Sequence, residues 1–140
     1  LEAKQILKLP KIFVVQPKNC CPIVACWRDG MGALESLTFT KTIAEGTAIK
    51  KPIRLTKILD ILKKTNGGGL AVTEEEILKA TLDLSKNGFF VEPTCASAAV
   101  GLGKLRAKNL IGSDETTVVV LTGSGLKSSD FFTKNVELKL

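Results

Sequence analysis

A helical pattern of apolar residues runs through the segment "IRLTKILDILKKTNGG". Its apolar positions follow i, i+3, i+4, i+7 spacing, at Leu55, Ile58, Leu59 and Leu62. This spacing is typical of an amphipathic helix with one buried face. The pattern predicts a helix that ends at Asn66-Gly67, because asparagine and glycine readily adopt the left-handed conformation that terminates helices.

Two further helices are indicated by the residues at their starts. Thr73, with Glu76 three positions later, forms a capping-box pattern, and the helix it opens is expected to close at Asn87-Gly88. Pro93 occupies a typical first-turn position and opens a helix that ends near Asn109. Small residues line that last helix, so we expect it to pack tightly against a sheet; they are Ala96, Ala98, Ala99, Gly101 and Gly103.

Short apolar runs between these helices predict strands. They lie at Lys11–Pro17, Leu70–Val72, Phe89–Val91 and Thr116–Leu121. The last run is apolar without alternation, as expected for a strand that is covered on both faces. Strands that alternate with helices predict a layered α/β fold with a mainly parallel sheet flanked by helices. Ligands bind such sheets beyond the carboxyl ends of the strands, where residues 122–125, "TGSG", are expected to lie.

Composition favours one α/β domain over residues 1–140. The 140 residues are 44% apolar and 24% charged, which is ordinary for a globular domain. The net charge of +6 comes from basic residues spread in ones and twos, without a basic tract or an aromatic ladder, so we expect no nucleic-acid partner. No apolar stretch approaches the roughly 20 residues that span a bilayer, so we expect no membrane partner.

The chain contains no histidine, which excludes Ser-His-Asp and Cys-His nucleophile schemes within it and removes the commonest metal ligand. The four cysteines are Cys20, Cys21, Cys26 and Cys95, and their spacing does not match a zinc site. Free thiols in a reducing, cytoplasmic setting are therefore expected, with Cys95 as a small core residue. No metal site is predicted.

Two glycine-rich stretches have both structural and functional interpretations. Gly67–Gly69 follow a helix and precede a strand, the reverse of the order in a phosphate-binding loop, so a helix stop is the favoured interpretation. The second stretch, "LTGSGLK" at residues 121–127, is compatible with an ordinary exit turn from a strand. It also contains a candidate hydroxyl ligand, Thr122.

Four stretches, in order, resemble the carboxyl-terminal part of threonine synthases, which belong to the pyridoxal-phosphate enzymes that also include serine and threonine dehydratases. The stretches are "TIAEGTAIKKP", "GGGLAVTEEEILKA", "GFFVEPTCASAAVGLGKL" and "VVVLTGSGLK". The resemblance runs from about Pro10 to Lys127 and implies part of the larger domain of a tryptophan synthase β-like fold. It also implies the conversion of O-phosphohomoserine and water to threonine and phosphate.

The same resemblance implies three cofactor-binding positions. Thr122 matches the threonine that hydrogen-bonds the pyridine nitrogen of pyridoxal phosphate, and a neutral hydroxyl does not hold that nitrogen protonated as a carboxylate would. The resemblance also implies that Gly46 belongs to the loop that passes one face of the ring and that Glu92 lies near the ring end. For Glu92 an equally weighted alternative is that its carboxylate offsets the positive helix end at Pro93.

Two features of the family have no match in this sequence: the motif that carries the Schiff-base lysine and the glycine-asparagine phosphate loop. Lys127 is not expected to replace that lysine. We therefore expect a carboxyl-terminal fragment that is inactive alone and contains no catalytic residue. Its expected partners are the missing amino-terminal part, a small-molecule substrate and a second copy in a homodimer. A fragment of a serine or threonine dehydratase and a freestanding ligand-binding module remain alternatives, although "TGSGLK" differs from the serine- or cysteine-containing turn usual in dehydratases.

Overall fold

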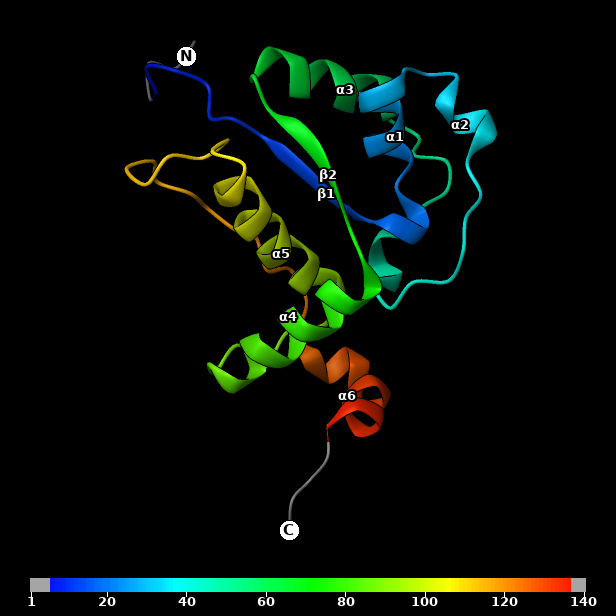
Figure 1. The fold of residues 1–140 in the computed structure, drawn as a ribbon, viewed down its shortest axis with the longest axis vertical. Helices are drawn as coiled ribbons and strands as arrows, with labels where there is room; N and C mark the ends of the chain where they lie inside the picture. Colours follow the sequence, from blue (N-terminus) through cyan, green and yellow to red (C-terminus); the bar gives the residue numbers. More distant parts are fainter. Residues whose placement is uncertain (1–5, 137–140) are drawn as a thin grey trace.

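The computed structural model describes residues 6–136, which form a parallel pair of strands flanked by helices (Figure 1). In chain order the elements are β1 (Phe13–Pro17), η1 (Lys18–Cys20), α1 (Pro22–Asp29), α2 (Ala33–Ser36), η2 (Glu45–Thr47), α3 (Leu55–Lys64), β2 (Gly68–Val72), α4 (Glu74–Lys86), α5 (Pro93–Ala107), η3 (Gly125–Ser128) and α6 (Ser129–Asn135). The mixed α/β class predicted from the sequence is confirmed.

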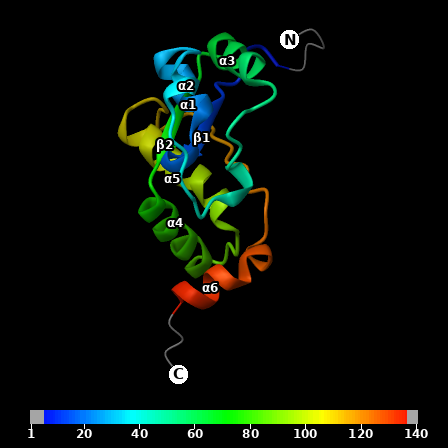
Figure 2. The same cartoon turned by 90° about the vertical axis from the view of Figure 1, so that its right-hand side faces the viewer.

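Strands β1 and β2 pair in parallel, in a register that runs from Phe13 opposite Gly68 to Pro17 opposite Val72. Helices α1 and α3 lie on one side of this pair, and α5 lies on the other (Figures 1 and 2). Helix α4 follows β2 after one residue, so its amino terminus lies at the carboxyl end of that strand. The strand pair therefore has helices on both sides, as the alternating pattern predicts.

Helix α3 forms where the apolar stripe predicts it. Leu55, Leu59 and Leu62 are buried, and the first two pack with Cys26 of α1. Beyond the helix, Asn66 has a φ of 50°, which confirms the predicted left-handed stop. Gly67 then passes so close to β1 that a Cβ at this position would lie 1.7 Å from the carbonyl oxygen of Ile12. The helix-stop interpretation of the triple glycine is confirmed, and its last two residues are the start of β2.

Helix α4 begins with the predicted capping box. The N–H of Glu76 donates to the Thr73 hydroxyl at 3.3 Å, and the N–H of Thr73 donates to the Glu76 carboxylate at 2.9 Å. That carboxylate also pairs with Lys104 of α5 at 2.7 Å. Burial raises the pKa of Glu76, but the hydrogen bonds from Lys104 and the Thr73 N–H outweigh this effect and hold the pKa below its usual value. The same carboxylate therefore caps α4 and ties it to α5.

Helix α5 packs against β1 through a residue without a side chain. A Cβ at Gly101 would lie 2.3 Å from Cγ2 of Val15, well inside van der Waals contact. Gly103, two residues later, is exposed, and a Cβ there would meet nothing within 4 Å. The tight approach of this helix to the sheet, predicted from its small residues, is confirmed at Gly101.

Two predicted strands are wrong. Phe89–Val91 contributes only a single antiparallel bridge, between Val91 and Ser124. Thr116–Leu121 has no regular secondary structure, and two of its apolar side chains are largely exposed, Val118 at 82% and Val120 at 66%. A strand needs a neighbour for its backbone N–H and C=O groups, and within residues 6–136 no other segment pairs with residues 116–121. The observed sheet therefore contains two strands instead of four.

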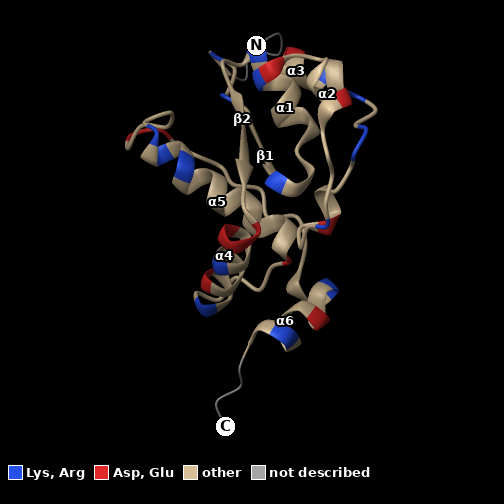
Figure 3. Ribbon diagram, turned by 45° about the vertical axis from the view of Figure 1, so that its right-hand side comes forward, with Lys and Arg blue, Asp and Glu red and all other residues tan. Residues whose placement is uncertain are grey.

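Basic and acidic residues are distributed over several elements. Figure 3 shows lysines and arginines on α4, α5 and α6 and on the loop after α2, with acidic residues interspersed. Two exposed ion pairs, Arg28 with Asp29 and Lys79 with Asp83, join near neighbours in the sequence. A third exposed pair joins distant segments, Lys11 with Glu115 at 2.9 Å. None of the helices in residues 6–136 combines the length and the apolar character that a membrane crossing requires.

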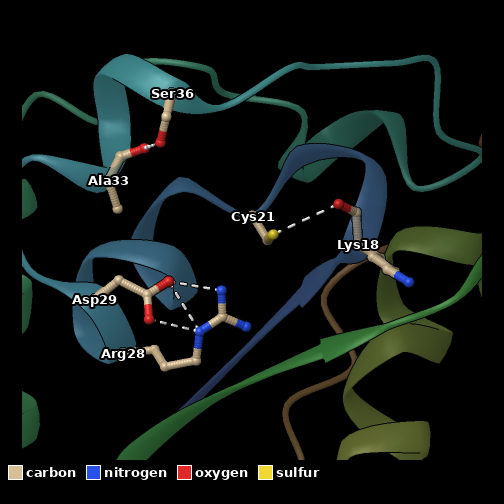
Figure 4. Close-up of polar contacts among 6 residues, drawn as sticks. All are labelled: Lys18, Cys21, Arg28, Asp29, Ala33 and Ser36. Atoms are coloured by element: carbon tan, nitrogen blue, oxygen red, sulfur yellow. Dashed lines mark hydrogen bonds and ion pairs between the residues drawn. The ribbon is translucent and has the colours of Figure 1, made fainter.

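The cysteines near α1 are free thiols, and Figure 4 shows the local contact that one of them, Cys21, makes. The Cys21 thiol lies 3.5 Å from the carbonyl oxygen of Lys18, and Arg28 forms a two-point ion pair with Asp29. Burial raises the pKa of Cys20 and of Cys21, so both thiols stay protonated at neutral pH and are weak nucleophiles. These contacts belong to the packing around α1.

Candidate functional site at the amino terminus of α5

The amino terminus of α5 gathers all three cofactor-binding residues predicted from the sequence. Glu92 is the N-cap residue, Pro93 is the first helical residue, and Thr94 and Cys95 follow it in the first turn. Proline is favoured at this position because its missing N–H would have no partner within the helix. No side chain caps the helix. The first turn therefore presents polar side chains to two neighbouring loops.

The first neighbouring loop is the turn at residues 122–125. The N–H of Glu92 donates to the carbonyl oxygen of Gly123 at 3.2 Å, and the N–H of Gly125 donates to the carbonyl oxygen of Phe90 at 3.0 Å. These two bonds flank the antiparallel bridge between Val91 and Ser124. The turn is thereby held against the residues that lead into α5.

Both glycines of this turn lie where a side chain would collide. A Cβ at Gly123 would lie 2.0 Å from Oε1 of Glu92, and a Cβ at Gly125 would lie 2.9 Å from the ring of Phe90. Close packing against residues 90–92 therefore requires glycine at both positions.

Thr122 stands at the open edge of the turn. The residue is exposed, and its hydroxyl oxygen lies 3.5 Å from the thiol of Cys95. The neighbouring Ser124, and not Thr122, caps the following short helix, with its hydroxyl accepting from the N–H of Leu126 at 3.3 Å. The Thr122 hydroxyl is therefore not used in capping η3 and lies on the side of the turn that faces the α5 amino terminus.

The second neighbouring loop contains Gly46. Its N–H donates to the Thr94 hydroxyl at 3.1 Å, and a Cβ at Gly46 would lie 3.0 Å from that hydroxyl oxygen. The same loop is tied to α4, because the N–H of Ile43 donates to the Glu74 carboxylate at 2.7 Å. Gly46 thus contacts the first turn of α5 at Thr94, the residue before Cys95, whose thiol contacts Thr122 and Gly123.

Sequence reasoning missed the contribution of two residues. Cys95 was predicted as a small core residue, which its 2% exposure confirms, but its thiol also contacts Thr122, Gly123 and Glu92. Thr94 was not singled out, yet it binds the loop at Gly46. Their position in the first turn after Pro93 is the signal that could have identified them, since side chains there lie beside the unpaired N–H groups of a helix.

A separate hollow lies elsewhere in residues 6–136. It has a volume of about 480 Å³ and is bordered by Phe13, Trp27, Gly68 and Leu105 among others. Phe13 and Gly68 begin their strands, whereas ligands of parallel sheets bind beyond the carboxyl ends. The hollow is thus separate from the α5 amino terminus.

Pyridoxal phosphate fits part of this arrangement. The exposed Thr122 hydroxyl is a neutral group that can form a hydrogen bond with a pyridine nitrogen. The next residue, Gly123, packs closely against Glu92 because it has no side chain. The chemistry of these described residues is therefore compatible with one wall of a cofactor site. A lysine and a phosphate-binding loop are not among the groups gathered here.

Comparison with known proteins defines the class of this protein. Residues 2–123 match the family described as "Pyridoxal-phosphate dependent enzyme", a segment that includes Gly46, Glu92 and Thr122. The match covers most of the chain, so the chain belongs to the pyridoxal-phosphate-dependent enzyme family.

Within that family, several curated proteins similar to this chain are threonine synthases. The chain is 38% identical to the threonine synthase of Methanosarcina acetivorans over 120 residues, which is 85% of this chain and 30% of that protein. It is also 38% identical to the threonine synthase of Methanocaldococcus jannaschii over 124 residues, and 31% identical to the chloroplastic threonine synthase 2 of Arabidopsis thaliana over 135 residues. The chain spans 31% and 26% of the lengths of these two proteins.

Proposed function

We propose that this chain is the carboxyl-terminal part of a threonine synthase, a pyridoxal-phosphate-dependent lyase that converts O-phosphohomoserine and water to threonine and phosphate. Residues 1–140 form one α/β unit of the larger domain, and this unit requires the rest of the enzyme for activity. The observation that carries the proposal is the meeting of Gly46, Glu92 and Thr122 around one helix terminus. The names of the similar proteins favour threonine synthase over a dehydratase.

In this proposal each residue has a limited role. Pyridoxal phosphate, when bound, withdraws the negative charge that develops on the substrate carbon. Thr122 offers its hydroxyl to the ring nitrogen and, being neutral, leaves that nitrogen less protonated than a carboxylate would. Glu92 packs against Gly123 of the turn. Gly46 has no side chain, so its loop can approach Thr94 closely enough for its N–H to donate to the Thr94 hydroxyl. These residues bind and orient, and none of them forms a covalent bond.

Replacing Thr122 by valine tests the proposed contact in the complete enzyme. The variant keeps the β-branched shape but loses the hydroxyl, so the absorption spectrum of the bound cofactor should shift. Turnover should fall by up to about tenfold, the effect of one neutral hydrogen bond. Thr122→Asp should be more damaging, because it places a carboxylate where a neutral partner is needed. Thr116→Val, an exposed threonine before the turn, is the matched control and should change neither quantity. An unchanged spectrum and turnover in Thr122→Val would contradict the proposal.

The uncovered run before the turn supports a second part of the proposal, association with another copy. Val118 and Val120 are exposed in a β-branched segment that is not paired with another strand within residues 6–136, and such segments recruit partners. The purified chain should therefore be a dimer by sedimentation velocity, and Val120→Lys should shift it toward monomer. Ile53→Lys is the control, since Ile53 is equally apolar and exposed but lies before α3. A wild-type monomer at all concentrations tested argues against association.

A further inference from the structure

The Cys95 thiol occupies the centre of the contacts that hold the 122–125 turn. The side chain is 2% exposed and lies in the first turn of α5. The N–H of Gly123 donates to its sulfur at 2.8 Å, and the sulfur lies 3.5 Å from both the Gly123 carbonyl oxygen and the Thr122 hydroxyl oxygen. One side chain thus contacts both residues at the start of the turn, 27 and 28 positions away in sequence.

The bond from Gly123 is needed because this residue is buried. Its carbonyl oxygen is already paired with the N–H of Glu92 at 3.2 Å. Its N–H has the Cys95 sulfur as acceptor, and a buried N–H left without an acceptor destabilises the fold by about 1 to 3 kcal/mol. The thiol therefore completes the hydrogen bonding of the residue that follows Thr122.

The proton of the Cys95 thiol can set the orientation of the Thr122 hydroxyl group. With its sulfur accepting from Gly123, Cys95 can donate its own proton to one of two oxygens at 3.5 Å, the Thr122 hydroxyl or the Gly123 carbonyl, and Oε1 of Glu92 is more distant at 3.9 Å. The Gly123 carbonyl already accepts from the N–H of Glu92, which leaves the Thr122 hydroxyl as the acceptor without another donor among these contacts. A hydroxyl that accepts from the thiol has its own proton free to point outward from the turn. That proton is the one a pyridine nitrogen could accept.

We propose that Cys95 is a positioning residue that orients the Thr122 hydroxyl as a hydrogen-bond donor toward the cofactor ring. This inference rests on the proposed function, since it assumes that Thr122 meets the ring nitrogen. In this inference the thiol acts through its hydrogen bonds to Gly123 and Thr122 and not only by filling space in the core. A serine at this position preserves the donor and the acceptor, whereas a valine preserves only the bulk.

The first test does not require the cofactor. In the 140-residue chain, amide hydrogen exchange at Gly123 is measured by nuclear magnetic resonance for the wild type, Cys95→Val and Cys95→Ser. Cys95→Val should speed exchange at Gly123 by roughly tenfold, through the loss of one hydrogen bond. Cys95→Ser should remain within about threefold of the wild type, because the hydroxyl accepts in place of the thiol. Cys26→Val is the matched control, since Cys26 is 3% exposed in the separate α1 cluster.

The second test measures the cofactor in the complete enzyme. Cys95→Val should shift the absorption spectrum in the same direction as Thr122→Val and lower kcat about three- to tenfold with KM changed less than twofold. Cys95→Ser should restore the spectrum and kcat, a rescue that a purely space-filling role does not predict. Cys26→Val should leave both unchanged.

The outcomes separate the two proposals. If Thr122→Val shifts the spectrum and Cys95→Val does not, the positioning role of Cys95 is wrong and the proposed function stands. If serine and valine at position 95 are equally damaging, the thiol acts by packing and the inference is again wrong. If Gly123 exchange responds to Cys95→Val but neither Thr122→Val nor Cys95→Val moves the spectrum, the proposed contact of Thr122 fails and the positioning role fails with it.

Discussion

Gly101→Ala should lower the free energy of unfolding by about 1 to 3 kcal/mol, the usual effect of forcing an extra methyl group into a packed core. The added Cβ would lie 2.3 Å from Cγ2 of Val15, so α5 must move away from β1 or the valine must leave its rotamer. Urea denaturation of the 140-residue chain measures the change. A movement of α5 away from β1 would also displace the first turn of this helix, so the candidate site should be disturbed as well.

Gly103→Ala is the matched control for this substitution. The same helix gains the same methyl group at an exposed position with nothing within 4 Å, and alanine is the better helix former by about 0.5 to 1 kcal/mol. This variant should therefore be at least as stable as the wild type. Combining Gly101→Ala with Val15→Ala should recover part of the loss, since it removes the atoms that collide. Equal stability of the Gly101→Ala and Gly103→Ala variants would show that α5 does not approach β1 as closely as described.

Gly123→Ala should destabilise the chain by a similar amount, about 1 to 3 kcal/mol, and alter the candidate site directly. The new Cβ would lie 2.0 Å from Oε1 and 2.4 Å from Cδ of Glu92, so the carboxylate must leave its place against the turn. In the complete enzyme the cofactor spectrum should change together with stability. Gly112→Ala, where a Cβ makes only ordinary contacts at 3.8 Å, is the control and should leave the spectrum unchanged.

A double-mutant cycle isolates the cause of this second effect. Glu92→Ala removes the atoms that a Cβ at position 123 would meet, so Gly123→Ala should have a smaller effect on stability in that background than in the wild type. The coupling between the two substitutions is the measured quantity. Strict additivity would mean that Glu92 does not pack on Gly123, and the description of the turn would then be wrong.

The elements predicted correctly are those with local signals. The capping box at Thr73 and Glu76 and the proline at position 93 act within one helical turn, so the residues that form these interactions are neighbours in sequence. The apolar stripe of α3 is similarly contained in one segment. Such elements can be predicted without knowing how the rest of the chain folds.

The strand predicted at residues 116–121 shows the limit of that reasoning. Its β-branched residues favour a strand, but strand formation depends on a partner that the run itself does not specify. Val118 and Val120 are exposed where burial was expected. The sequence pattern correctly predicts that the strands of the sheet are parallel, as β1 and β2 are. It does not predict their register, because the register depends on contacts between distant segments.

For the candidate site too, some features could be predicted from the sequence and others only the fold shows. Gly46, Glu92 and Thr122 were selected through the resemblance to a family, and their gathering at the α5 amino terminus emerged only from the fold. Cys95 was judged by its alanine-rich surroundings, which correctly predicted burial. Its contacts with Thr122 and Gly123 bridge 27 and 28 residues, so nothing local in the sequence indicates them.

The central claim is that the turn at residues 122–125 holds the nitrogen end of a pyridoxal phosphate ring. A crystal structure of the complete enzyme with pyridoxal phosphate bound tests it most directly, through the distance between the Thr122 hydroxyl oxygen and the ring nitrogen. We expect a hydrogen bond of about 2.7 to 3.2 Å, with the Cys95 sulfur still in contact with Thr122. A ring nitrogen paired with a carboxylate, or a Thr122 hydroxyl beyond hydrogen-bonding distance of the ring, would contradict the claim.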